Sequence, residues 1–259
     1  MARGKKLIVG NWKMNPPTVE EAKTIFSKIK RAAARLRHTE VVICPSDLHI
    51  VPLTKLSQRS KVVIGVQDVF WEDQGFFTGQ ISPAMARNAG ARYAIVGHSE
   101  KRKLGETNEQ VSLKLEVTVR DGLRAIVCVG EKARDREGLF FEELKNQILA
   151  TLVHIPRGAF AHSVIVAYEP LWEIGRKDFQ AMKVTDVHEI SIFIRKVLND
   201  AFGSEASRVP ILYGGSVSSN NAAAIVHEGG IEGLLVGRQS LDAAAFSAIL
   251  KQVDSPHGR

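Results

Sequence analysis

The sequence contains little cysteine and little aromatic side chain. Of its 259 residues two are cysteines, Cys44 and Cys128, and aromatic residues make up 7%. Two cysteines cannot form a disulfide framework or a cysteine-rich metal cluster. Each of them ends an apolar run, so we expect two buried thiols. A reducing compartment suits such a protein, and the cytoplasm is the simplest location.

Long apolar runs are also missing. No stretch approaches the roughly 20 apolar residues needed to cross a membrane. The basic segment Met1–Lys6 lacks the apolar run and the cleavage site of a secretory signal. We therefore expect no membrane partner.

The charge is positive but is not concentrated. The formal net charge is +7, and the densest basic cluster, Arg31–Arg37, falls on one predicted helix. Aromatic residues do not interleave with the basic ones as base-stacking platforms would require. The sequence therefore favours a solvated helix face and no nucleic-acid partner. A basic protein that binds RNA or DNA is the alternative, and its binding would depend steeply on salt.

Short apolar runs rich in Val and Ile alternate with longer amphipathic segments. Each run is too short for a helix and predicts a strand that is buried on both faces. The runs are Leu7–Gly10, Val41–Cys44, Val62–Val66, Tyr93–Gly97, Ala125–Val129, Val164–Tyr168, Ile211–Tyr213 and Gly233–Val236.

The segments between these runs carry helix signals. Thr107 and Gln110 form a predicted capping box, and Ser82 followed by Pro83 predicts a helix start. Pro52 weakens a further helical pattern between Asp47 and Gln58. The remaining helices are predicted at Thr18–Leu36, Thr107–Asp121, Leu139–Val153, Val184–Phe202, Asn220–His227 and Asp242–Val253.

Strict alternation of strands and helices predicts an α/β protein with a parallel sheet, and eight strands suffice to close a barrel. We therefore predict a (β/α)8 barrel, as a single domain over residues 1–259 with a polar tail from about residue 254. An open, doubly wound sheet is the alternative. Against it, the first strand leads into Asn11–Asn15 and not into a glycine-rich dinucleotide turn.

Polar residues follow the predicted strands, at the end of a barrel where active sites form. Any one of them alone is more often a solvated or structural residue. Together they supply a carboxylate, an imidazole, an ammonium and glycine-rich turns on one rim, which suits proton transfer on an anionic substrate. They are Asn11 and Lys13; Gln67 and Asp68; His98, Ser99 and Glu100; Cys128 and Glu131; Glu169; Gly214, Gly215 and Ser216; and Gly237 and Arg238.

Four segments resemble the signature segments of the triosephosphate isomerase family, in the family's order and at about its spacing. They are Gly10–Asn15, Gly97–Arg102, Ala167–Gly175 and Tyr213–Val217. The likeness runs from the first predicted strand to the last predicted helix. It implies a barrel enzyme of glycolysis and gluconeogenesis that interconverts dihydroxyacetone phosphate and D-glyceraldehyde 3-phosphate. The reaction passes through an enediol(ate) and uses no cofactor and no metal.

The resemblance also implies roles for individual residues. Glu169 matches the family's catalytic base, and His98 matches its neutral electrophile. Lys13 matches the lysine that offsets the developing negative charge. Asn11 would orient Lys13 and the substrate, and Glu100 matches a carboxylate near that lysine.

A mobile lid and a phosphate site follow from the same likeness. The lid would begin with Pro170, Leu171, Trp172, Glu173 and Ile174, and its closure would exclude water. The phosphate ligands implied are Gly175, Gly215, Ser216, Gly237 and Arg238. Backbone N–H groups suffice for such a dianion.

The loop Phe70–Gly79 predicts a contact with a second copy of the chain. It is rich in aromatic side chains, which are poorly placed in water: Phe70, Trp71, Phe76 and Phe77. In the family this loop docks into the other subunit of a two-fold dimer, with Thr78 at its tip and Gln67 at the contact. The alternative is that these rings pack on their own barrel.

Some residues depart from the family pattern. Arg176–Gln180 replaces a threonine- and lysine-containing hinge, and Arg238 stands where a second glycine is common. Lys101 and Asp68 replace an arginine and an asparagine. A related barrel with a lost or changed activity is therefore an alternative. A metal enzyme is another, although the histidines and carboxylates lack the usual ligand spacing.

Overall fold

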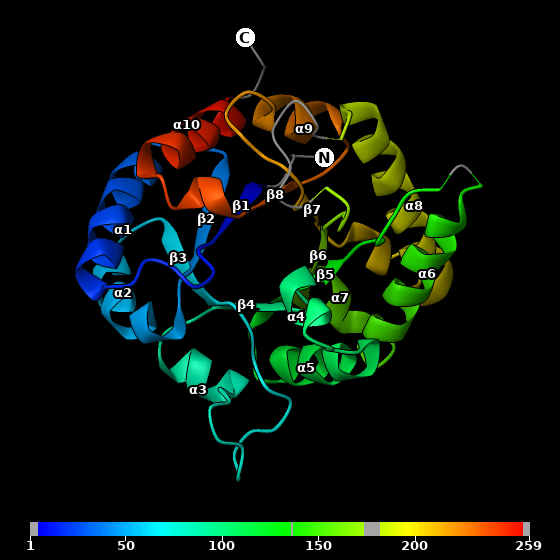
Figure 1. Cartoon of the computed structure of the whole chain (residues 1–259), viewed down its shortest axis with the longest axis horizontal. Helices are drawn as coiled ribbons and strands as arrows, with labels where there is room; N and C mark the ends of the chain where they lie inside the picture. The colour runs from blue at the N-terminus through cyan, green and yellow to red at the C-terminus, as the bar shows by residue number, and fades with distance from the viewer. Residues whose placement is uncertain (1–4, 136, 174–181, 256–259) are drawn as a thin grey trace.

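The computed structural model describes residues 5–135, 137–173 and 182–255. Figure 1 shows strands at the centre and helices in a ring around them. Parallel strands in chain order form a closed barrel: β1 (Lys6–Asn11), β2 (Thr39–Cys44), β3 (Val62–Val66), β4 (Tyr93–Val96), β5 (Arg124–Val129), β6 (Val164–Tyr168), β7 (Ile211–Tyr213) and β8 (Gly233–Val236). The barrel closes where β8 pairs with β1, with Leu7 opposite Gly233. This confirms the predicted barrel and excludes the open sheet.

Helices follow the strands and form the outer layer. They are α1 (Val19–Ala33), α2 (Ile50–Ser57), α3 (Pro83–Asn88), α4 (Ser99–Lys103), α5 (Asn108–Arg120), α6 (Leu139–Leu152), α7 (Phe160–Ser163), α8 (Val184–Phe202), α9 (Ala222–Glu228) and α10 (Ala243–Asp254). The described part of the chain has no helix long and apolar enough to cross a membrane.

The capping signals act as predicted. At α5 the Thr107 hydroxyl accepts a hydrogen bond from the Gln110 N–H, and the Gln110 side chain bonds back to the Thr107 N–H. At α3 the Ser82 side chain accepts from the Met85 N–H, and Pro83 opens the helix. Each cap satisfies N–H groups that have no partner within the helix.

The structure differs from the sequence prediction at its shortest helices. Pro52 does not interrupt α2, because it lies in the first turn, where a helix makes no use of the missing N–H. Helix α4 follows His98 directly and α7 precedes β6; neither was predicted. Helices of this length show too few turns to produce a periodic pattern.

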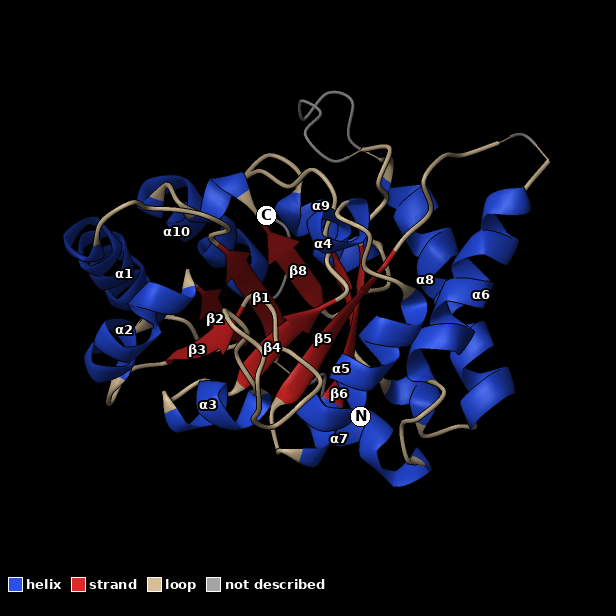
Figure 2. Ribbon diagram, turned by 60° about the horizontal axis from the view of Figure 1, so that its bottom comes forward, coloured by secondary structure: helices blue, strands red, loops and turns tan. Residues whose placement is uncertain are grey.

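Strand side chains divide between two cores. Leu7 and Val9 point into the barrel, where they pack with side chains from other strands, whereas Ile8 points outward to the helices. Both faces are therefore buried, which explains the continuous apolar runs. Cys44 and Cys128 are free and lie in the barrel interior, so the prediction of buried thiols is confirmed. Figure 2 shows the strands enclosed by helices.

Helix α10 ends at about residue 254, where the polar tail was predicted to begin. Asp254 is the last residue of α10. Its carboxylate accepts hydrogen bonds from the Arg37 N–H at 2.9 Å and the His38 N–H at 2.7 Å. These bonds fasten the end of α10 to the segment that enters β2.

Candidate active site

A pocket of about 110 Å³ opens at the carboxyl ends of the strands. It brings together residues from loops that are far apart in the sequence, and it includes most of the predicted site. Its lining residues are Asn11, Lys13, His98, Glu169, Gly214, Gly215, Ser216, Val217, Leu235, Gly237, Arg238 and Gln239. Glu100 is absent from the lining but pairs with Lys13. Gly175 and Ile174 lie outside the described residues.

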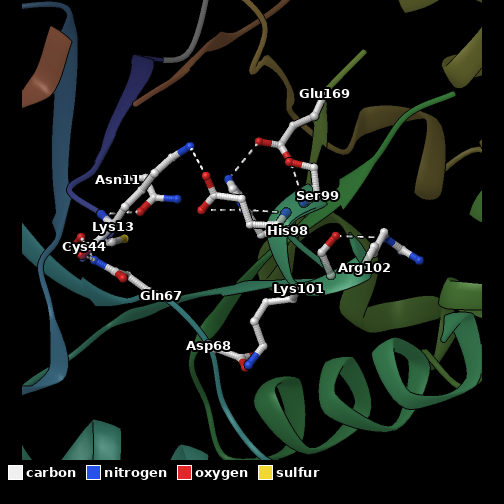
Figure 3. Close-up of polar contacts among 12 residues, drawn as sticks. Asn11, Lys13, Cys44, Gln67, Asp68, His98, Ser99, Lys101, Arg102 and Glu169 are labelled. Carbon is white, nitrogen blue, oxygen red and sulfur yellow. Dashed lines mark hydrogen bonds and ion pairs between the residues drawn. The ribbon is translucent and has the colours of Figure 1, made fainter. Parts of the chain in front are cut away.

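Glu169 follows β6 directly and is 3% exposed. Its Oε2 accepts a hydrogen bond from the Ser99 N–H at 3.1 Å, and its Oε1 lies 3.2 Å from His98 Nε2 (Figure 3). Burial raises the pKa of Glu169, but the His98 ring and the Ser99 N–H lower it by more, and the net pKa is below its ordinary value. The carboxylate is therefore ionised at neutral pH.

His98 is the N-cap residue of α4, and its environment determines which ring nitrogen carries the proton. Nδ1 accepts a hydrogen bond from the Glu100 N–H at 3.2 Å. A ring nitrogen accepts only when it is unprotonated, so the proton of the neutral ring lies on Nε2, which donates to Glu169.

Two effects act in opposite directions on the charge of His98. Burial lowers its pKa, and the Glu169 carboxylate raises it by more, so that the net pKa lies above the ordinary value. A second proton on Nδ1 would face the Glu100 N–H and remove that hydrogen bond. The hydrogen-bond geometry therefore fits the neutral ring, with Nε2–H directed at Glu169.

Lys13 lies just beyond β1 with a φ of 54°, which is uncommon for a residue with a side chain. Two hydrogen bonds hold its backbone: Asn11 Oδ1 accepts from the Lys13 N–H at 3.0 Å, and Gln67 Nε2 donates to the Lys13 carbonyl at 2.8 Å. Gln67 Nε2 also donates to the Cys44 carbonyl at 2.9 Å, which anchors the amide. Figure 3 shows Asn11 and Gln67 beside Lys13, where they hold the strained backbone. Lys13 Nζ reaches Glu100 Oε1 at 2.7 Å. Gln67, which was predicted as a dimer contact, thus also supports the lysine of its own chain.

The turn after β7 needs glycine because two acidic side chains approach it closely. A Cβ on Gly214 would lie 2.8 Å from Glu169 Cγ. A Cβ on Gly215 would lie 2.3 Å from the Tyr213 hydroxyl and 2.6 Å from Glu173 Oε2. A larger residue at either position would displace the carboxylate beside it.

The loops after β7 and β8 place backbone groups around the pocket. The side-chain amide of Asn221 donates to the Ser216 carbonyl at 2.9 Å, which fixes that peptide. A Cβ on Gly237 would lie 4.0 Å from Lys13 Nζ, so Gly237 borders the lysine. Arg238 follows at the pocket edge and is exposed.

The segment after Glu169 is fastened by a buried carboxylate to which the sequence had assigned no role. Glu131 is 0% exposed. Its Oε1 accepts hydrogen bonds from the Tyr168 hydroxyl and from Trp172 Nε1, both at 2.8 Å, and Arg134 Nε lies 3.3 Å away. A carboxylate two residues after an apolar strand was the available signal, but the two groups that donate at 2.8 Å, Tyr168 and Trp172, come from β6 and the loop after it.

These groups make the pocket suitable for moving a proton on an anionic substrate. The ionised Glu169 can accept a proton, the His98 Nε2–H can donate a hydrogen bond, and Lys13 supplies positive charge. In the described ranges no group of three or more His, Cys, Asp or Glu side chains could hold a metal ion.

Comparison with known proteins agrees with this arrangement. The family model described as triosephosphate isomerase matches residues 6–253. A triosephosphate isomerase of Moorella thermoacetica is 40% identical over 248 residues, which is 95% of this chain and 98% of the relative. One from Dehalococcoides mccartyi is 38% identical over 249 residues, covering 95% of this chain and 96% of the relative.

A solved structure shows the same fold. The crystal structure of triosephosphate isomerase from Bartonella henselae superposes with a TM-score of 0.83 at 31% identity, covering 97% of this chain and 100% of the other. A match that extends from β1 into α10 includes every strand end that lines the pocket. Because sequence and fold agree over this length, the chain belongs to the triosephosphate isomerase family.

Proposed function

We propose that this protein interconverts dihydroxyacetone phosphate and D-glyceraldehyde 3-phosphate, with Glu169 as the base. The observation that carries the proposal is the 3.2 Å contact between the buried Glu169 carboxylate and His98 Nε2 at the wall of the pocket. An ionised base and a hydrogen-bond donor side by side are what a proton shift between a carbinol carbon and its carbonyl neighbour requires.

In the proposed reaction Glu169 removes a proton from the carbon next to the carbonyl and later returns it to the adjacent carbon. One carboxylate suffices for both steps, because the two carbons are neighbours. The lowered pKa of Glu169 keeps the base ionised before substrate arrives. The Ser99 N–H and His98 hold the carboxylate in this structure, and substrate binding must exchange these bonds for contacts with the substrate.

Negative charge develops on the substrate oxygens as the proton leaves. In this proposal His98 donates from Nε2 to these oxygens, and Lys13 offsets their charge from the opposite wall. Asn11 supports Lys13 through the hydrogen bond to its backbone N–H. Glu100 holds the Lys13 ammonium at 2.7 Å and does not itself line the pocket, so we assign it a positioning role.

The phosphate group belongs, in this proposal, at the loops after β7 and β8. The N–H groups of Gly215, Ser216, Gly237 and Arg238 are the donors assigned to it, and the Arg238 guanidinium at the pocket edge adds positive charge. Gly175 stays a prediction, as does the lid that begins at Pro170. Asn221 holds the Ser216 carbonyl and so restrains the backbone of this loop next to the Ser216 N–H.

A coupled assay tests the proposal. Purified protein receives D-glyceraldehyde 3-phosphate, and dihydroxyacetone phosphate is followed through an NADH-linked dehydrogenase. We expect turnover in the range of about 1–10³ s⁻¹ that is typical of enzymes, and its loss in Glu169→Gln. A folded protein with no turnover would favour a related barrel with a changed activity.

We also propose a homodimer built on the loop Phe70–Gly79. Figure 1 shows this loop, between β3 and α3, extending away from the ring of helices. The Phe70 ring packs on Trp71 and Phe77 at 4.1 and 4.7 Å, whereas Phe76 is 106% exposed. Exposed apolar side chains also follow the two preceding strands, at Met14 and Leu48. An apolar surface spread over three neighbouring loops supports contact with a second copy.

Phe76→Asp should shift the protein from dimer to monomer in size-exclusion chromatography with light scattering. The reason is that a carboxylate would have to be buried in the contact. Leu139→Asp, at an exposed position on α6, is the matched control and should leave the mass unchanged. A wild-type mass equal to one chain would contradict the dimer.

We place the protein in the cytoplasm, because both thiols are free and buried. Cell fractionation tests this assignment, and recovery of the protein outside the cytoplasm would contradict it.

A further inference from the structure

Glu173 is a buried carboxylate that the proposed chemistry does not use. It is 0% exposed and comes one residue after Trp172. Its Oε2 accepts a hydrogen bond from the Tyr213 hydroxyl at 2.5 Å. Its Oε1 accepts from the Met182 N–H at 2.9 Å and from the Ser216 N–H at 3.3 Å. A buried charge needs such partners, and these three donors satisfy it.

One of the three donors to Glu173, the Ser216 N–H, is also assigned to the substrate. The Ser216 N–H is among the groups that the proposed function gives to the phosphate of the substrate, and Ser216 lines the pocket. The Asn221 side chain bonds to the Ser216 carbonyl and so restrains the Ser216–Val217 peptide, next to the one that carries the Ser216 N–H, which itself points at Glu173 Oε1. Glu173 Oε1 therefore already accepts a hydrogen bond from the Ser216 N–H, the donor that the proposed function assigns to a phosphate oxygen.

The structure accommodates this carboxylate closely. A Cβ on Gly215 would lie 2.6 Å from Glu173 Oε2, so the absence of a side chain at Gly215 makes room for it. Tyr213 and Ser216, on the two sides of Gly215, both donate to Glu173. Glu173 is thus bonded across the turn that follows β7.

We infer that Glu173 competes with the substrate's phosphate for the Ser216 N–H and thereby weakens phosphate binding. This inference rests on the proposed function for the identity of the ligand, but not for the contact itself. A phosphate dianion cannot share this donor with a carboxylate, because their charges repel within a few ångströms in a site of reduced dielectric. Glu173 must therefore give up its bond to Ser216 when the anion binds.

The competition makes Glu173 a residue that sets substrate affinity, and it is not a catalytic residue. Its carboxylate does not line the pocket beside Glu169 and His98. Removing its charge should therefore change KM and the affinity for phosphate more than kcat. A purely structural role would instead lower the thermal stability and leave anion affinity where it was.

Two variants separate charge from hydrogen bonding. Glu173→Gln keeps an oxygen acceptor for the N–H groups of Ser216 and Met182 but carries no charge. Glu173→Ala removes both. Glu228→Gln, at an exposed position at the end of α9, changes the net charge equally and is the control.

Binding of inorganic phosphate to wild type and variants is measured by isothermal titration calorimetry at fixed ionic strength. Repulsion between a carboxylate and a dianion at this range corresponds to roughly a tenfold change in affinity. We expect Kd for phosphate to fall about tenfold in Glu173→Gln and to stay at the wild-type value in Glu228→Gln. The KM for triose phosphate should fall in parallel, with kcat changed by less than about threefold. Glu173→Ala should also bind phosphate more tightly, with a lower Tm.

The outcomes distinguish this inference from the proposed function. A phosphate Kd in Glu173→Gln within twofold of wild type overturns the inference, whether or not the enzyme turns over. If Glu173→Gln binds phosphate more tightly than wild type but wild type shows no isomerase activity, the competition at this anion site is supported and the proposed reaction is overturned instead. A lower Tm in both variants at unchanged Kd would leave Glu173 a structural role and would also overturn the inference.

Discussion

Replacing Glu169 with aspartate is expected to lower kcat by about 10²- to 10⁴-fold, the range that a positioned acid–base group contributes. The variant keeps the negative charge but withdraws the carboxylate by one methylene group. Because the wild-type carboxylate lies within hydrogen-bond range of both the Ser99 N–H and His98 Nε2, the loss would be a loss of position and not of charge.

The fold should survive this change. Deleting one buried methylene group costs about 1 kcal/mol, which corresponds to a shift of roughly 2–4 °C in Tm for a chain of this size. The coupled assay and thermal unfolding by circular dichroism measure the two effects. Glu228→Asp, the same exchange at an exposed position, is the control and should retain full activity. A near-normal rate in Glu169→Asp would remove Glu169 from the role of base.

Replacing Lys13 with methionine is expected to lower kcat/KM by at least about 10²- to 10³-fold, the effect of removing one donor to a developing oxyanion. Methionine keeps the length and the apolar stem of the side chain but not the charge. Inhibition by inorganic phosphate and sulfate should weaken as well, because Lys13 borders Gly237 in the loop assigned to the phosphate.

The same substitution should change stability little. The side chains of the Lys13–Glu100 pair are 31% and 51% exposed, and pairs exposed to this extent contribute only about 0–1 kcal/mol. Steady-state kinetics, phosphate inhibition and thermal unfolding test the prediction together. Lys23→Met is the matched control, since Lys23 also pairs with a glutamate at 2.7 Å but lies on α1, away from the pocket. Phosphate inhibition equal to that of wild type would contradict the role of Lys13.

The contrast between these effects follows from where each charge lies. An ion pair at the surface is screened by water in both the folded and the unfolded chain, so it adds little to folding. The same ammonium at the pocket wall acts on charge that develops in the transition state, where water is displaced and the dielectric constant is lower. Function therefore depends on Lys13 far more than the fold does.

The strands were predictable from the sequence because their signal is local. A strand buried on both faces reads as an uninterrupted apolar run, and β3, β6, β7 and β8 have the predicted bounds. The caps at Ser82 and Thr107 were predictable for a similar reason, since the hydroxyl and the N–H that it accepts from lie three residues apart. The resemblance in four segments then pointed to the residues at the strand ends.

Other features were not readable along the chain because their partners are distant in sequence. The Gln67 side chain bonds to the carbonyls of Lys13 and Cys44, across two neighbouring strands. His98 owes its ring orientation to α4, a helix of 5 residues that shows no periodic pattern. The sequence offered a polar residue at each of these positions but no sign of its bonding partner.

The sequence by itself determined the eight strands, the alternation that makes the sheet parallel, and the polar residues that follow all the strands but the second. The tertiary structure alone decided that Glu169 lies beside His98, that Lys13 is held in a strained backbone conformation, and that Glu173 is buried against Ser216. The physical reason is the closure of the barrel. Apolar periodicity is a property of one segment, whereas the neighbours of a side chain at the rim exist only once β8 has paired with β1.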